Sequence, residues 1–171
     1  MAVEREVEMD RIFPLKLDFQ GLLALSRAYM NKEDSASVFF ERIQRIDGYE
    51  DILIHADKDR FVYEAIGGQD VFFTALELAQ ILKNDANGYN GNNIRLLSCG
   101  SGRSSDGLAQ QLANELHVNV LAPSETLWIR EDGNLFVSDN GVLADMWNDH
   151  IDVNETGEWR LFSPQTKEES I

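Results

Sequence analysis

The chain has 171 residues, 43 % of them hydrophobic, which is enough for one compact domain with a hydrophobic core. Its 30 acidic and 15 basic residues give a formal net charge of −15, which opposes binding to nucleic acid and to anionic membrane surfaces. A single cysteine excludes a disulfide framework within the chain and any multi-cysteine zinc site.

The two ends of the chain are predicted to be tails around one domain at 12–163. Residues 1–11 are charged without sustained periodicity, and residues 164–171 are polar. The start is also too charged for a signal peptide, and no apolar run approaches the roughly 18 residues that a membrane helix needs.

Two helices are predicted before the first strand. Apolar residues at 22–30 suit a short helix, and SVFFERIQRI at 37–46 has apolar residues at close to helical spacing. The dipeptide Asp47-Gly48 is expected to end the second helix.

A buried strand and a capped helix follow. The continuous apolar run at 52–54 is typical of a strand that is buried on both faces. For the helix expected over 74–83, Thr74 is a suitable N-cap and Glu77 completes a capping box. Its apolar side is expected to include Leu76, Ala79, Ile81 and Leu82.

The second half repeats the alternation of strand and helix. The pattern predicts a strand at 94–98, an amphipathic helix at 104–116 and a strand at 118–123, followed by a β-hairpin around Asp132-Gly133. This order implies right-handed crossovers and an α/β fold with a parallel sheet that is covered on both faces.

His55 and Cys99 follow two successive predicted strands. Because functional groups gather at the carboxyl ends of parallel strands, both side chains are expected to face one crevice. The nearby start of the helix predicted at 104–116 would favour a thiolate, and the histidine could serve as its base. Gly100 and Gly102 would allow a tight turn and bring N–H groups toward a substrate carbonyl.

Other interpretations of these residues stay open. Cys99 could simply pack as a small hydrophobic residue, and His55 could be structural. Asp57 and Asp59 could orient the imidazole of His55, but they also suit an ordinary loop. Asp145, Asp149, His150 and Asp152 match no known metal-ligand spacing, His117 and His150 are weaker catalytic candidates, and we expect no metal site.

Two sequence patterns carry a family resemblance. The order strand-His, helix, strand-Cys, helix, with SCGSG at 98–102, resembles the caspase-like cysteine peptidases of clan CD, including separases and the self-processing protease domains of clostridial and MARTX toxins. Residues 47–164, with LLSC, LAQQLA, APSETLW and TGEW, also look like C-terminal modules of bacterial polymorphic toxins of the Rhs/YD-repeat and LXG kinds. The resemblance implies a three-layer α/β/α fold with a mostly parallel sheet and a C-terminal β-hairpin.

The resemblance also implies a function. Cys99 would be the nucleophile of a peptidase and His55 its base or acid, with N–H groups near Cys99 and at Ala56 binding the oxyanion. Clan CD members normally have glycine at the position of Ala56, so a degenerate site is one alternative. We expect no cofactor, because the acidic chain offers few residues for the basic inositol hexakisphosphate pocket of the toxin proteases.

The expected partners follow from the same resemblance. They are a protein or peptide substrate and a cognate immunity protein, which would present a basic face to this acidic chain. A toxin module would be bacterial and exported within a larger protein or delivered into target cells, and otherwise cytoplasmic. The alternatives are a catalytically inactive α/β interaction module of the same toxin system and a different hydrolase or transferase that uses the same crevice.

Overall fold

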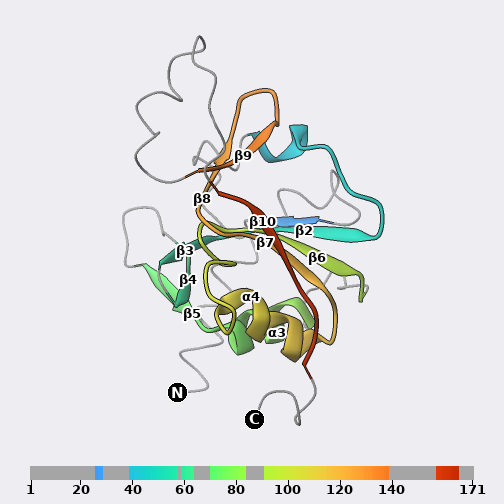
Figure 1. Cartoon of the computed structure of the whole chain (residues 1–171), viewed down its shortest axis with the longest axis vertical. Coiled ribbons are helices and arrows are strands. Elements are labelled where there is room, and N and C mark those ends of the chain that lie inside the picture. Colours follow the sequence, from blue (N-terminus) through green and yellow to red (C-terminus); the bar gives the residue numbers. More distant parts are fainter. Residues whose placement is uncertain are drawn as a thin grey trace.

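The computed structural model of the chain describes residues 26–28, 39–57, 59–63, 70–83, 91–138 and 157–165 (Figure 1). They form a mixed α/β fold around a five-stranded sheet with the order β1-β2-β6-β7-β10. The first four strands run parallel and β10 runs antiparallel to β7. The strands of this central sheet are β1 (Ser26–Ala28), β2 (Tyr49–Leu53), β6 (Asn93–Leu97), β7 (Val120–Pro123) and β10 (Trp159–Phe162).

Smaller elements connect these strands. In the sequence, three strands that follow β2 and precede β6 form a separate antiparallel sheet. They are β3 (His55–Asp57), β4 (Arg60–Tyr63) and β5 (Val71–Phe73). The described helices are the 3-10 helix η1 (Phe40–Arg42), α3 (Ala75–Lys83) and α4 (Leu108–Leu116). An antiparallel hairpin follows β7 and is made of β8 (Thr126–Ile129) and β9 (Leu135–Ser138).

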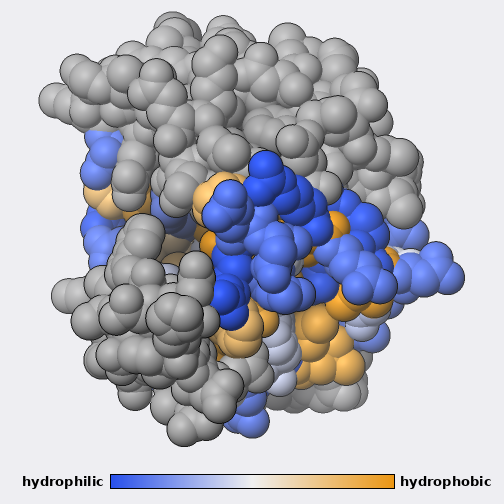
Figure 2. Space-filling view, turned by 90° about the horizontal axis from the view of Figure 1, so that it is seen from above, coloured by the Kyte–Doolittle hydropathy of each residue, from blue (hydrophilic) through white to orange (hydrophobic). Residues whose placement is uncertain are grey.

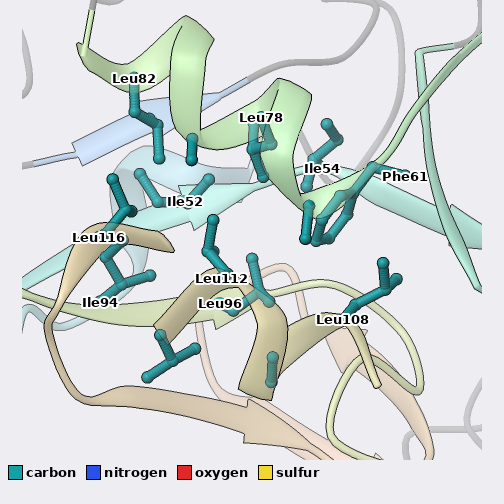
Figure 3. Packing of buried hydrophobic residues seen from close by; sticks show 14 of the residues in the cluster. Ile52, Ile54, Phe61, Leu78, Leu82, Ile94, Leu96, Leu108, Leu112 and Leu116 are labelled. Carbon is teal, nitrogen blue, oxygen red and sulfur yellow. The ribbon is translucent and has the colours of Figure 1, made fainter. Parts of the chain in front are cut away.

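The main hydrophobic core lies between the central sheet and the two α-helices. In Figure 1, α3 and α4 lie together below the sheet. Figure 3 shows side chains from both helices and from β2, β4 and β6 pointing toward one another in this helix-side cluster. The labelled members are Ile52, Ile54, Phe61, Leu78, Leu82, Ile94, Leu96, Leu108, Leu112 and Leu116.

A second core covers the opposite face of the sheet, beneath η1 and the β8–β9 hairpin. The buried residues of this hairpin-side cluster are Phe40, Ile43, Leu53, Leu97, Leu127 and Val137. Cys99, Ile129, Leu135 and Trp159 pack against it and are partly buried. Because neighbouring positions of a strand point to opposite faces, Ile52 and Leu96 belong to one core, and Leu53 and Leu97 belong to the other.

A charge cluster extends the hairpin-side face. Asp51 and Arg95 are paired in the register of β2 and β6, and both are buried. The Arg95 guanidinium donates from Nε and Nη2 to the two Asp51 carboxylate oxygens, at 2.7 and 2.8 Å. Arg45 binds the same carboxylate at 2.8 Å. The buried charges of Asp51 and Arg95 need these hydrogen-bonded partners, because an isolated buried charge is strongly unfavourable.

Several predicted elements are confirmed. The sheet is mostly parallel, strands lie over the apolar runs of β2, β6 and β7, and the hairpin turns at Asp132-Gly133. The capping box of α3 is formed, because the N–H of Glu77 donates to the Thr74 hydroxyl at 3.1 Å and the N–H of Thr74 donates to the Glu77 carboxylate at 2.9 Å.

Other local predictions are wrong. Ser26–Ala28 forms strand β1 instead of a helix, and in the described part of 37–46 Phe39 is helical and is followed by η1, but the helix does not continue to residue 46. After η1 the backbone is extended at Ile43, whose side chain enters the hairpin-side cluster. Leu76 is 49 % exposed, whereas Ala79, Ile81 and Leu82, expected on the same side of the helix, are buried together with Leu78.

In the part that the structure describes, the caspase-like three-layer arrangement is not confirmed. Both α-helices cover the same face of the central sheet, and the other face is covered by η1 and the hairpin (Figure 1). The small sheet and the antiparallel strand β10 were not predicted. The tail predicted at 1–11 lies outside the described residues. In the tail predicted at 164–171, the N–H of Gln165 donates to the Asn114 side chain of α4 at 2.9 Å.

The surface of the described residues is mixed in hydropathy. On the face shown in Figure 2, the described residues are mainly hydrophilic, with smaller hydrophobic areas between them. Among the helices that the structure describes, none combines the length and hydrophobicity needed to cross a membrane.

Candidate functional site

The pairing of β2 with β6 positions His55 and Cys99. These strands are neighbours, run parallel, and pair Leu53 with Leu97 at their carboxyl ends. The ladder continues beyond this pair, because the N–H of Ile54 donates to the Leu97 carbonyl at 3.2 Å. His55 and Cys99 each lie two residues further along, so they occupy equivalent positions just past the same edge of the sheet.

Strand alternation directs both side chains away from the helix-side cluster. Ile54 and Ala56 contact the helix-side cluster, so His55 between them points to the opposite face. Cys99 packs against the hairpin-side cluster, as does Leu97 two positions earlier. Both His55 and Cys99 are half-buried.

The thiol contacts the backbone of β8. The N–H of Leu127 donates to the Cys99 Sγ at 3.4 Å, and the Sγ in turn donates to the Leu127 carbonyl at 3.7 Å. An N–H group directed at sulfur stabilises negative charge there, as a thiolate nucleophile requires. Sequence reasoning missed this contact, because it depends on how the chain returns after β7.

The loop after Cys99 is held by the segment that joins β7 to β8. The N–H of Gly100 donates to the Glu125 carbonyl at 2.8 Å, and the N–H of Gly102 donates to the Pro123 carbonyl at 2.9 Å. Both groups were candidate oxyanion donors. Since each N–H group already donates to a backbone carbonyl, neither could donate to an oxyanion without breaking an existing hydrogen bond.

The two glycines meet different local requirements. Gly100 has a φ of +65°, a backbone conformation that residues with side chains rarely adopt. Gly102 is buried, and a Cβ at this position would lie 2.7 Å from the Ala122 carbonyl oxygen. The sequence therefore places glycine both where the turn needs its backbone conformation and where the loop approaches β7.

The start of α4 corrects the predicted environment of the thiol. This helix begins at Leu108, with Gly107 as N-cap, rather than near 104–106. The N–H of Ala109 in its first turn donates to the Ser101 carbonyl at 3.1 Å. The helix therefore begins nine residues after Cys99, with its first turn bound to the loop carbonyl of Ser101.

The backbone at Ala56 is oriented by the small sheet. A two-residue loop joins Asp57 to Arg60, and this pair closes the hairpin of β3 and β4. Hydrogen-bonded and non-bonded pairs alternate along an antiparallel ladder, so the Ala56–Phe61 pair is a non-bonded one. The N–H of Ala56 therefore points away from β4.

The candidate orienting acids lie at the tip of this hairpin. Asp57 is exposed and lies 3.9 Å from the Arg60 guanidinium, and Asp59 is also exposed. His117 is exposed at the end of α4, in a left-handed backbone conformation. The loose group of Asp145, Asp149, His150 and Asp152 lies outside the described residues, within which no His, Cys, Asp and Glu cluster is arranged to hold a metal ion.

Two buried polar atoms flank the thiol and its backbone partner. Ser98 Oγ and Trp128 Nε1 make no hydrogen bond within the part of the chain that the structure describes. Ser98 precedes Cys99, and Trp128 follows Leu127. Since strand neighbours point to opposite faces, the Ser98 hydroxyl lies away from the thiol.

Comparison with known proteins gives a family without an assigned function. The family model described as Domain of unknown function (DUF8616) matches residues 25–137, which is more than half of the chain. No curated protein and no solved structure matches the chain. The matched span extends from β1 to β9 and includes both His55 and Cys99. The chain therefore belongs to the DUF8616 family.

Proposed function

We propose that the protein is a caspase-like cysteine hydrolase that cleaves peptide bonds, with Cys99 as nucleophile and His55 as general base and acid. The observation that carries this proposal is the equivalent position of the two residues, each two residues past the paired ends of neighbouring parallel strands. The element order strand-His, helix, strand-Cys, helix supports a caspase-like relationship.

The chemistry follows from the two side chains. His55 takes the thiol proton, and the Cys99 sulfur attacks the substrate carbonyl carbon to form a tetrahedral intermediate. Collapse of this intermediate breaks the C–N bond, and the amine leaves with the proton carried by His55. A water molecule then gives a proton to His55 and attacks the thioester, which releases the acid and restores the thiol.

The donor for the oxyanion is proposed from the backbone on the histidine side. The N–H groups of Gly100 and Gly102 are already used, whereas the Ala56 N–H points away from β4. For attack, the sulfur must exchange its contact with the Leu127 carbonyl for the substrate, while the Leu127 N–H can continue to stabilise the thiolate.

The biological setting is proposed from the sequence resemblance. In this setting the domain is the effector or processing module of a bacterial polymorphic toxin, exported within a larger protein or delivered into target cells. A cognate immunity protein with a basic face would bind it, because opposite charges accelerate and orient association with a chain of net charge −15.

One observation favours a second candidate, a catalytically inactive interaction module. The thiol packs against the hairpin-side cluster and contacts both backbone groups of Leu127, as a structural cysteine would. Two of the proposed oxyanion donors are also engaged within the chain. In this case Cys99 contributes packing only.

Single substitutions separate the two candidates. Cys99→Ala and His55→Ala should each remove nearly all cleavage of a peptide library, and nearly all toxicity on expression, because nucleophile and base act as one unit. Ser98→Ala is the matched control, since it changes the neighbouring buried position on the opposite face. Circular dichroism should show that all three variants remain folded. Full activity of Cys99→Ala, or a wild type without thiol-dependent cleavage, would support the interaction module.

A further inference from the structure

A pocket of about 350 Å³ opens on the hairpin side of the sheet, away from the edge that holds His55 and Cys99. It lies between the segment that follows η1, the strands β6 and β7, the β8–β9 turn and β10. Its walls are mainly apolar and include Ile43, Ile46, Leu121, Leu135 and Trp159. Arg95 also lines it, four residues before Cys99 on the same strand.

Arg95 is the charged residue among the described residues that line this pocket. The residue is only 6 % exposed, and its Nε and Nη2 atoms bind Asp51 and the Gln44 carbonyl. Within the described part of the chain, its Nη1 donates to no group. The guanidinium is therefore held rigidly by three hydrogen bonds on one side and keeps further donors for a pocket occupant.

The charge balance at the pocket favours an anion. Two guanidinium groups, of Arg45 and Arg95, share the single carboxylate of Asp51, which leaves one positive charge in excess. Among the described residues that line the pocket, none is acidic. A negative group that replaces water at Arg95 would complete the pairing of this buried cluster.

We propose that this pocket binds a small organic carboxylate of roughly a dozen non-hydrogen atoms in all, most of them in an apolar body. The carboxylate pairs with the Arg95 Nη1 donors, and the apolar body contacts Ile46, Leu121 and Trp159. The site is separate from the candidate catalytic site, since four strand residues from Arg95 to Cys99 span about 13 Å. The proposal does not depend on whether Cys99 is a nucleophile.

A titration of the full chain with three related compounds tests the proposal. The probes are 4-phenylbutanoate, 4-phenylbutan-1-ol and 4-phenylbutylamine, which share the apolar body and differ in charge. By isothermal titration calorimetry, the carboxylate should bind saturably and at least about tenfold more tightly than the alcohol or the amine, because only it pairs with the guanidinium. In NMR spectra, the largest amide shifts should occur at the pocket residues Gln44 and Asn134.

Matched variants distinguish recognition in the pocket from a general charge effect. Ile46 is 37 % exposed at the pocket, so Ile46→Glu should weaken binding of the carboxylate by about fivefold or more, and Ile46→Gln should weaken it less. Leu76→Glu adds the same charge on α3, across the sheet, and should leave binding unchanged. Equal affinity for the three probes, absence of saturable binding, or equal effects of Ile46→Glu and Leu76→Glu would overturn the proposal.

Discussion

At the residue scale, the approach of Gly102 to β7 sets a limit on the loop that follows the candidate nucleophile. A Cβ at this position would lie 2.7 Å from the carbonyl oxygen and 3.0 Å from the carbonyl carbon of Ala122. Both atoms belong to the backbone of a buried strand position, which cannot move as a flexible side chain can.

Gly102→Ala should therefore lower the free energy of unfolding by about 1–3 kcal/mol, because the added methyl group forces the loop away from β7. Urea unfolding followed by circular dichroism measures this loss. Ser105→Ala, at an exposed position of the same loop, should change it by less than about 0.5 kcal/mol. If Gly102→Ala is as stable as Ser105→Ala, the close packing of the loop against β7 is wrong.

At the element scale, α3 depends on its capping box. The Thr74 hydroxyl accepts from the Glu77 N–H, and without it the first turn of α3 keeps an unsatisfied donor. Thr74→Ala should lower the free energy of unfolding by about 1 kcal/mol, and Thr74→Ser, which keeps the hydroxyl, should be close to wild type. Equal stability of the two variants would show that the cap contributes nothing.

Elements that neighbouring residues specify by themselves could be predicted from the sequence, and elements that depend on contacts with distant residues could not. The capping box of α3 and the Asp132-Gly133 turn are each formed by residues that lie close together in the sequence. The helix expected at 37–46 ends early, because the backbone is extended at Ile43, whose side chain enters the hairpin-side cluster, and Arg45 binds Asp51. Strand β10 is short and needs β7 as its partner, a pairing that its own residues do not reveal.

The same distinction holds for the candidate site. Two apolar runs joined by one crossover were sufficient to predict neighbouring strands that bring His55 and Cys99 to one edge. The use of the Gly100 N–H by Glu125 and the contact of the thiol with Leu127 were not predictable. Both depend on the path of the chain after β7, which no local residue pattern encodes.

At the scale of the whole molecule, the net charge of −15 should reduce stability through repulsion between acidic groups. Raising the NaCl concentration from about 0.02 M to about 0.3 M shortens the screening length to below 10 Å and weakens this repulsion. The melting temperature measured by differential scanning calorimetry should therefore rise by a few degrees. A constant or falling melting temperature would show that favourable ion pairs outweigh the repulsion.

The most direct test of the proposed Cys99–His55 pair is the rate of alkylation of the single cysteine by iodoacetamide at pH 6. Because the chain has one cysteine, the mass of the intact folded protein reports on Cys99 alone. If His55 promotes the thiolate, the wild type should react at least about tenfold faster than His55→Ala, whose thiol should react only near an ordinary pKa of about 8.5. Equal and slow reaction of the two proteins at pH 6 would contradict a catalytic Cys99–His55 pair.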